Sequence, residues 1–109
     1  MSNQEFIQKF IKGGQKYGAY CHLAIVEDRL INYSTEICVI DRENKTAKVN
    51  VKKYSNTTSR IQSTLRWELK KAGYEITDYV GEEAYWWNYG YQGAGNWTTS
   101  EVKERYANG

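Results

Sequence analysis

The chain offers few side chains that could perform catalysis or hold a metal ion. It has one histidine, His22, and two cysteines, Cys21 and Cys38, whereas a structural zinc site needs about four protein ligands. Cys21 and His22 are neighbours in a segment that alternates as a strand, so their side chains should point to opposite faces. They would then be unable to form a nucleophile–base pair. We therefore expect no metal, no cofactor and no enzymatic activity.

The paired carboxylates and the glycines also indicate turns rather than chemistry. Glu27-Asp28 and Glu82-Glu83 fall in segments typical of turns. A catalytic carboxyl group needs a pKa shifted by burial or by a charged neighbour, and a solvated turn supplies neither. The glycines match neither a phosphate-binding loop nor a dinucleotide fingerprint; they stand at positions 13, 14 and 18 and at positions 90, 93 and 95.

The pattern of apolar residues predicts the elements that position these side chains. Ser2 and Glu5 have capping-box spacing ahead of a first helix, and period-two alternation predicts strands. The order α-β-β-β-α-β-β-α predicts an α+β fold, with an antiparallel sheet of four to five strands and helices packed on one face. The predicted helices cover residues 3–12, 58–72 and a short segment with Val102 and Tyr106, and the predicted strands cover 19–26, 30–40, 47–52, 74–80 and 84–92.

Length and composition indicate one domain over residues 1–109. Hydrophobic residues make up 40% of the chain and charged residues 26%, as in a soluble globular protein. No apolar run is long enough to span a membrane, and the sequence starting at Met1 lacks the features of a signal peptide. We expect a cytoplasmic protein. Cys21 and Cys38 are on adjacent predicted strands, where a disulfide is geometrically possible, but we expect the cytosol to keep both thiols reduced.

Positive charge is concentrated in the middle of the chain. The net charge is +2, but residues 42–71 carry nine cations and two anions, net +7, whereas 1–41 and 72–109 carry −1 and −4. Such a block can create a local field that attracts polyanions. Alternatively, the acidic C-terminal third folds over the block and cancels it. The nine cations are Arg42, Lys45, Lys48, Lys52, Lys53, Arg60, Arg66, Lys70 and Lys71.

The predicted helix over residues 58–72 places a tryptophan among these cations. Trp67 falls about 240° around the helix from Ile61, which begins the apolar stripe. In a nucleic-acid interface, Trp67 would stack on a base while the cations contact phosphates; in a protein interface it would be a hot spot. Otherwise the C-terminal aromatic segment covers it, with cation–π contacts. We predict that Trp67 and the nine cations bind nucleic acid or a partner.

Aromatic residues alternate along the last predicted strand. Their spacing resembles the stacking platforms of single-strand binders, but acidic Glu82 and Glu83 flank them where such platforms carry cations. We therefore favour a lid over the core or an interface between subunits. The candidate interface residues are Tyr85, Trp87, Tyr89 and Tyr91.

Residue usage adds a resemblance to proteins of mobile elements. Lys, Asn, Tyr and Ile, which have AT-rich codons, make up 36 of 109 residues, and proline is absent. This usage resembles that of small proteins of low-GC bacteria and their phages. In size and in its lack of catalytic motifs the chain resembles anti-CRISPR proteins. The resemblance implies a non-enzymatic inhibitor that engages nucleic acid or a nucleoprotein complex. The alternative is a homo-oligomeric interaction module with an aromatic interface.

Overall fold

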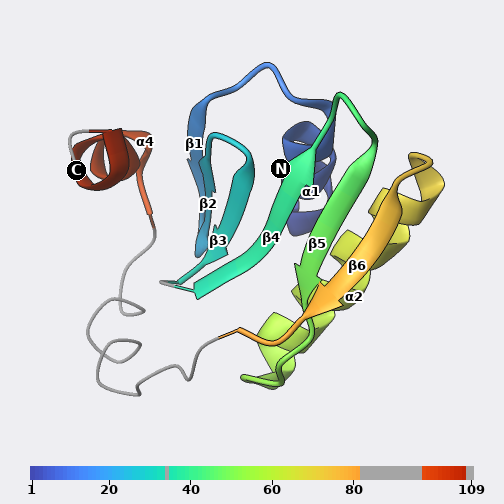
Figure 1. Ribbon diagram of the computed structural model, residues 1–109. Coiled ribbons are helices and arrows are strands. Elements are labelled where there is room, and N and C mark those ends of the chain that lie inside the picture. Colours follow the sequence, from blue (N-terminus) through green and yellow to red (C-terminus); the bar gives the residue numbers. More distant parts are fainter. Residues whose placement is uncertain (34, 82–96, 108–109) are drawn as a thin grey trace.

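A computed structural model describes residues 1–33, 35–81 and 97–107 of the chain. Within these ranges, six strands form one sheet in sequence order (Figure 1), which confirms the α+β prediction. Neighbouring strands are antiparallel, except that β6 runs parallel to β5, because the helix α2 connects them as a crossover. The elements are α1 (Asn3–Lys12), β1 (Tyr17–Tyr20), β2 (Leu23–Val26), β3 (Arg29–Asn32), β4 (Thr35–Asp41), β5 (Thr46–Asn50), α2 (Asn56–Lys71), β6 (Glu75–Tyr79), α4 (Thr99–Val102) and a π-helical segment (Lys103–Ala107).

The helix α1 has the predicted boundaries. The Ser2 hydroxyl accepts a hydrogen bond from the Glu5 backbone N–H at 3.1 Å, so one unpaired donor of the first turn has a partner. The helix ends at Gly13, whose φ of 84° is in the left-handed region that favours glycine. The apolar side chains between these ends are all buried: Phe6, Ile7, Phe10 and Ile11.

Two of the predicted strands are each two strands in the structure. Residues 19–26 contain the end of β1 and all of β2, and residues 30–40 contain β3 and most of β4. Cys21, Glu27 and Tyr33, six residues apart, follow β1, β2 and β3 with positive φ values of 52°, 58° and 57°, as tight hairpins require. The chain reverses at Cys21-His22 without glycine or asparagine. The prediction that this pair lies within a strand is therefore wrong.

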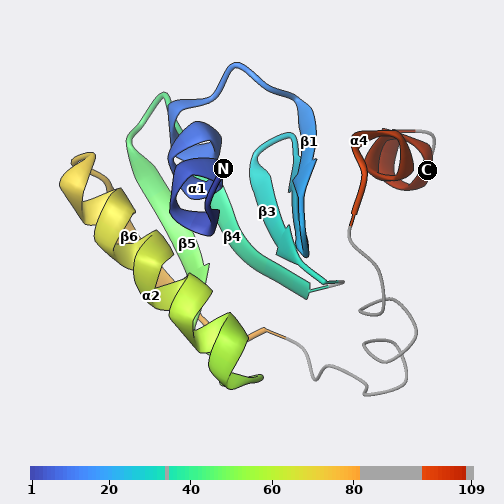
Figure 2. The same cartoon turned by 180° about the vertical axis from the view of Figure 1, so that it is seen from behind.

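Helices pack on both faces of the sheet, not on one face as predicted. α1 and α2 cover one face (Figure 2), where they bury alternate strand residues such as Leu23, Ile25 and Leu30. On the opposite face, Ala24, Val26 and Ile31 contact Val102 of α4. β2 is therefore buried on both sides. α4 packs on β1 and β2, whereas α2 packs on β5 and β6 at the other end of the sheet.

Buried polar contacts fix the rotation of α2 against the sheet. Ser55 accepts a hydrogen bond from the Thr58 backbone N–H at 3.2 Å and begins the helix. The Thr58 hydroxyl donates to Oδ1 of Asn32 at 2.7 Å, and the Gln62 amide donates to the carbonyl of Asn50 at 2.8 Å. Because these bonds are buried, a rotated helix would leave polar groups without partners. They thus determine which side chains of α2 face outward.

Candidate polyanion-binding surface

The outer face of α2 exposes the tryptophan that the sequence placed away from the core. The stripe residues Ile61, Leu65 and Leu69 are buried, whereas Trp67 is 57% exposed. The prediction that Trp67 lies off the apolar stripe is therefore confirmed. Lys71, one turn later, places its ammonium 5.0 Å from the centre of the Trp67 ring, within the range of a cation–π contact.

The outer face of α2 carries no acidic side chain. Glu68 is the only acidic residue between Asn56 and Lys71, and it is 5% exposed. Its Oε2 accepts hydrogen bonds from the side-chain amides of Gln4 at 2.8 Å and Gln8 at 3.0 Å, both on α1. These bonds, helped by the nearby Lys71 ammonium, hold the pKa of Glu68 below its ordinary value. The carboxylate is thus charged but lies between the two helices.

The exposed residues of this face form what we call the α2 strip. They include one aromatic ring and three cations, of which Lys71 contacts the ring: Arg60, Trp67, Lys70 and Lys71. At 1.5 Å of rise per residue, Arg60 and Lys71 lie about 16 Å apart along the helix axis. That length is comparable with about five steps of a nucleic-acid strand at 3.4 Å each.

Other predicted cations lie elsewhere. Arg66 is paired with Asp78 of β6 at 2.6 Å, which neutralises it. Lys48 on β5 pairs in register with Val39 and Thr77, and its neighbours Ala47 and Val49 face the helices, so Lys48 lies on the opposite face of the sheet. Lys48 of β5 and the cations of α2 therefore lie on different faces of the sheet. Lys52 and Lys53 lie in the segment between β5 and α2.

Arg42 and Lys45, at the β4–β5 hairpin, point to the carboxyl ends of the two helices. The Arg42 guanidinium donates to the carbonyls of Phe10 and Ile11 at the end of α1, at 3.2 and 3.3 Å from Nε. The Lys45 ammonium donates to the Ala72 carbonyl at 3.4 Å. Cations stabilise helix C-termini because the last carbonyls are unpaired and the helix dipole is negative there. Both residues therefore have a structural role.

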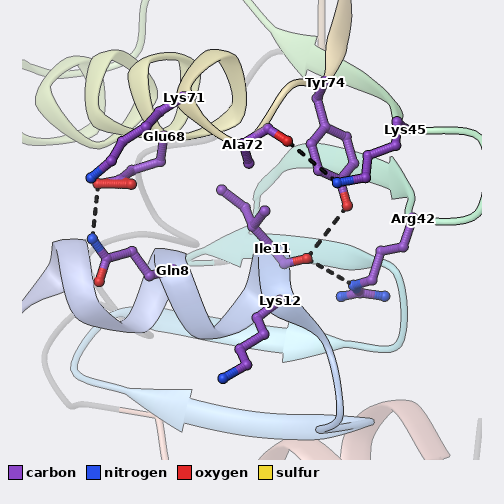
Figure 3. A pocket seen from close by; sticks show the side chains of 9 residues that line it. All are labelled: Gln8, Ile11, Lys12, Arg42, Lys45, Glu68, Lys71, Ala72 and Tyr74. Atoms are coloured by element: carbon purple, nitrogen blue, oxygen red, sulfur yellow. Dashed lines mark hydrogen bonds between the residues drawn. The ribbon is translucent and has the colours of Figure 1, made fainter.

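These two helix ends enclose an open hollow of about 580 Å³ (Figure 3). Its cations are Lys12, Arg42, Lys45 and Lys71, and its apolar wall is formed by Ile11, Ala72 and Tyr74. Lys71 belongs to both the hollow and the α2 strip. Lys12 is not among the predicted site residues, because it lies 30 residues before Arg42 in the sequence. The hydrogen bonds of Arg42 to the end of α1 bring the two residues together.

The acidic residues of the C-terminal third that the structure describes lie in two places. Glu75 and Asp78 are on β6, where Asp78 pairs with Arg66 of α2, and the others lie away from the α2 strip. Glu101 and Glu104 belong to α4 and the segment after it, at the β1–β2 end of the sheet (Figure 1). Glu82, Glu83 and the predicted aromatic interface lie outside the described residues; that interface comprises Tyr85, Trp87, Tyr89 and Tyr91.

Residues 1–33, 35–81 and 97–107 contain no cluster of three His, Cys, Asp or Glu side chains that could hold a metal ion. Within the same ranges, Cys21 and Cys38 are free thiols. Cys38 is buried, and burial raises its pKa to about 12, so it is protonated and unreactive at neutral pH. No helix in these ranges has the length and apolar character needed to cross a membrane.

Comparison with known proteins gives no match: no family model, curated protein or solved structure is similar to this chain.

Proposed function

We propose that this protein is a non-enzymatic binding protein that engages nucleic acid, or a complex that handles nucleic acid, through the α2 strip. One observation carries the proposal: α2 presents three cations and an exposed indole outward, while its only carboxylate is held against α1. Positive charge next to an exposed aromatic ring is the combination that single-strand binders use.

In this proposal the two kinds of side chain have different tasks. Arg60, Lys70 and Lys71 contact backbone phosphates and release condensed counterions, which supplies affinity without sequence preference. Trp67 stacks on an unpaired base, a contact that a duplex with paired and stacked bases does not offer. We therefore expect single strands to bind more tightly than duplexes of the same length.

The resemblance in size and residue usage extends the proposal to a biological setting. A cytoplasmic protein of a phage or another mobile element that binds nucleic acid could occupy the site where a host defence nuclease holds its substrate or guide. This role corresponds to that of an anti-CRISPR inhibitor. Composition, size and the basic surface support this role, and capture of the partner from the native host tests it.

Fluorescence anisotropy with labelled 20-nucleotide DNA and RNA, single-stranded and duplex, tests the proposal. The triple variant Arg60→Gln, Lys70→Gln, Lys71→Gln should bind at least tenfold more weakly, and the dependence of log K on log salt should become shallower. A matched control is the triple variant Lys9→Gln, Lys48→Gln, Lys103→Gln, which removes the same charge from exposed positions elsewhere. Equal losses in both variants, or no binding by the folded wild-type protein, would contradict the proposal.

The homo-oligomeric alternative makes a different prediction. A module assembled through Tyr85, Trp87, Tyr89 and Tyr91 would show a mass that rises with protein concentration in sedimentation experiments. It would show no salt-sensitive retention on heparin. The two measurements therefore separate the alternatives with one protein preparation.

A further inference from the structure

The hollow between the ends of α1 and α2 carries more positive charge than the two helix C-termini neutralise. Four cationic side chains, Lys12, Arg42, Lys45 and Lys71, surround it with one carboxylate, that of Glu68, which gives a net charge of +3. The two helix C-termini contribute roughly half a negative charge each, so about two positive charges remain.

Three of the five charged groups around the hollow, those of Arg42, Lys45 and Glu68, form hydrogen bonds within the protein. Arg42 and Lys45 bond the helix carbonyls, and the Glu68 carboxylate is held by two glutamine amides. In Figure 3 the nitrogens of Arg42 and Lys45 lie on one side of the hollow and that of Lys71 on the other. Lys12 contributes its stem to the lower rim, and its flexible side chain can turn toward a bound anion.

We propose that this hollow binds a phosphate monoester. A monoester carries close to two negative charges at neutral pH, which matches the excess charge. Three of the four cations are lysines, which bind phosphate as point charges. Nε and one terminal nitrogen of the Arg42 guanidinium donate to carbonyls, so this edge is not free for a two-bond pair with a planar carboxylate. The phosphate chemistry therefore fits better than a carboxylate ligand.

The wall of the hollow indicates that the phosphate is attached to a larger group. Ile11, Ala72 and Tyr74 present apolar surface beside the cations. A volume of about 580 Å³ is within the range of small-molecule sites. The phosphate can belong to a free nucleotide or to the end of a nucleic-acid strand. Three of the four cations of this site, Lys12, Arg42 and Lys45, lie outside the α2 strip, and only Lys71 is shared with it.

Calorimetric titration of the full chain with adenosine 5′-monophosphate tests the proposal, with adenosine as the ligand that lacks the phosphate. We expect saturable binding of the monophosphate and none of adenosine. Binding should weaken when the pH falls from 7.5 to 5.5, because the monoester loses its second charge near pH 6. Lys12→Gln and Lys45→Gln should each weaken binding by about five- to tenfold. Lys9→Gln, on the same helix but not lining the hollow, should not.

Oligonucleotides with a 5′-phosphate or a 5′-hydroxyl distinguish the two sources. Tighter binding of the phosphorylated strand, lost in Lys12→Gln, supports a strand end as the ligand. Saturable monophosphate binding without such a preference supports a free nucleotide. The Arg60→Gln variant should leave monophosphate binding unchanged even where it weakens the binding of long strands. This variant therefore tests the α2 strip separately from the hollow. Absence of both monophosphate binding and a 5′-phosphate preference, or an equal effect of Lys9→Gln and Lys12→Gln, would overturn the proposal.

Discussion

Nε2 of Gln4 lies 2.8 Å from Oε2 of Glu68, and this contact between α1 and α2 determines the charge of the outer face of α2. A glutamate one turn from a lysine on an exposed helix would ordinarily neutralise it. Here the amides of Gln4 and Gln8 draw the carboxylate to the inner side of the helix. Among the residues of α2, Arg60 and Lys70 therefore share the outer face with an indole and with no carboxylate, while Lys71 remains near Glu68.

We predict that Glu68→Gln destabilises the protein at neutral pH by about 1 to 2 kcal/mol, because the hydrogen bonds from Gln4 and Gln8 lose their charged acceptor. The lowered pKa of Glu68 gives the sign of the pH dependence. Its contribution is fully present above the ordinary glutamate pKa and disappears as the pH falls through the lower folded-state pKa. Urea unfolding should therefore show a large difference between variant and wild type at pH 7 and a small one at pH 3. A difference that grows on acidification would contradict the assignment.

A second prediction concerns the buried hydrogen bond between Thr58 and Asn32. Thr58→Val keeps the shape of the side chain but removes the hydroxyl that donates to Oδ1 of Asn32. Asn32 is 1% exposed, and its Nδ2 has no hydrogen-bond partner among the described residues. The change would leave both Oδ1 and Nδ2 of the buried Asn32 amide without hydrogen-bond partners, which should lower the free energy of unfolding by about 2 kcal/mol. Thr57→Val, at an exposed neighbouring position, is the control and should have little effect.

The regular elements could be predicted from the sequence because their signals are local. Ser2 and Glu5 mark the start of α1, and the spacing of Ile61, Leu65 and Leu69 identifies the buried side of α2 and the exposure of Trp67. The hairpin at Cys21 could not be predicted. Its positive φ is stabilised by strand pairing and not by a turn-forming residue, so the alternation of apolar residues continues through it.

The surface was predicted less well, because the charge of a face depends on contacts between distant residues. A count of charges along the sequence treats Arg42, Lys45 and Arg66 as free cations. In the structure, Arg42 and Lys45 donate to helix carbonyls, and Arg66 is paired with Asp78. Conversely, Lys12 comes from an acidic segment and joins the basic hollow only through the packing of α1 beside α2. Charge per segment is therefore a poor guide to charge per face.

For Trp67, we predict that Trp67→Ala weakens single-stranded nucleic-acid binding by about 5- to 100-fold, the loss expected for one stacked base. The free energy of unfolding should change by less than about 0.5 kcal/mol, because the indole is exposed. Anisotropy titrations and urea unfolding of the same preparation measure both. Trp67→Phe should restore part of the affinity, since a smaller ring still stacks. A stability loss comparable with a core truncation would instead place the indole in an internal contact.

The two consecutive glycines after α1 provide a matched pair of variants for the Arg42 cap. Gly13 and Gly14 both have positive φ, 84° and 92°, so alanine at either position should cost about 1 kcal/mol in backbone strain. A Cβ at Gly13 would also lie 2.8 Å from Nε of Arg42, whereas a Cβ at Gly14 would meet nothing within 4 Å. Gly13→Ala should therefore displace the guanidinium from the end of α1, lower the stability more than Gly14→Ala, and weaken monophosphate binding. Thermal unfolding and calorimetry of the two variants measure these differences. If the two variants have equal stability and equal monophosphate affinity, the position of Arg42 neither stabilises α1 nor shapes the hollow.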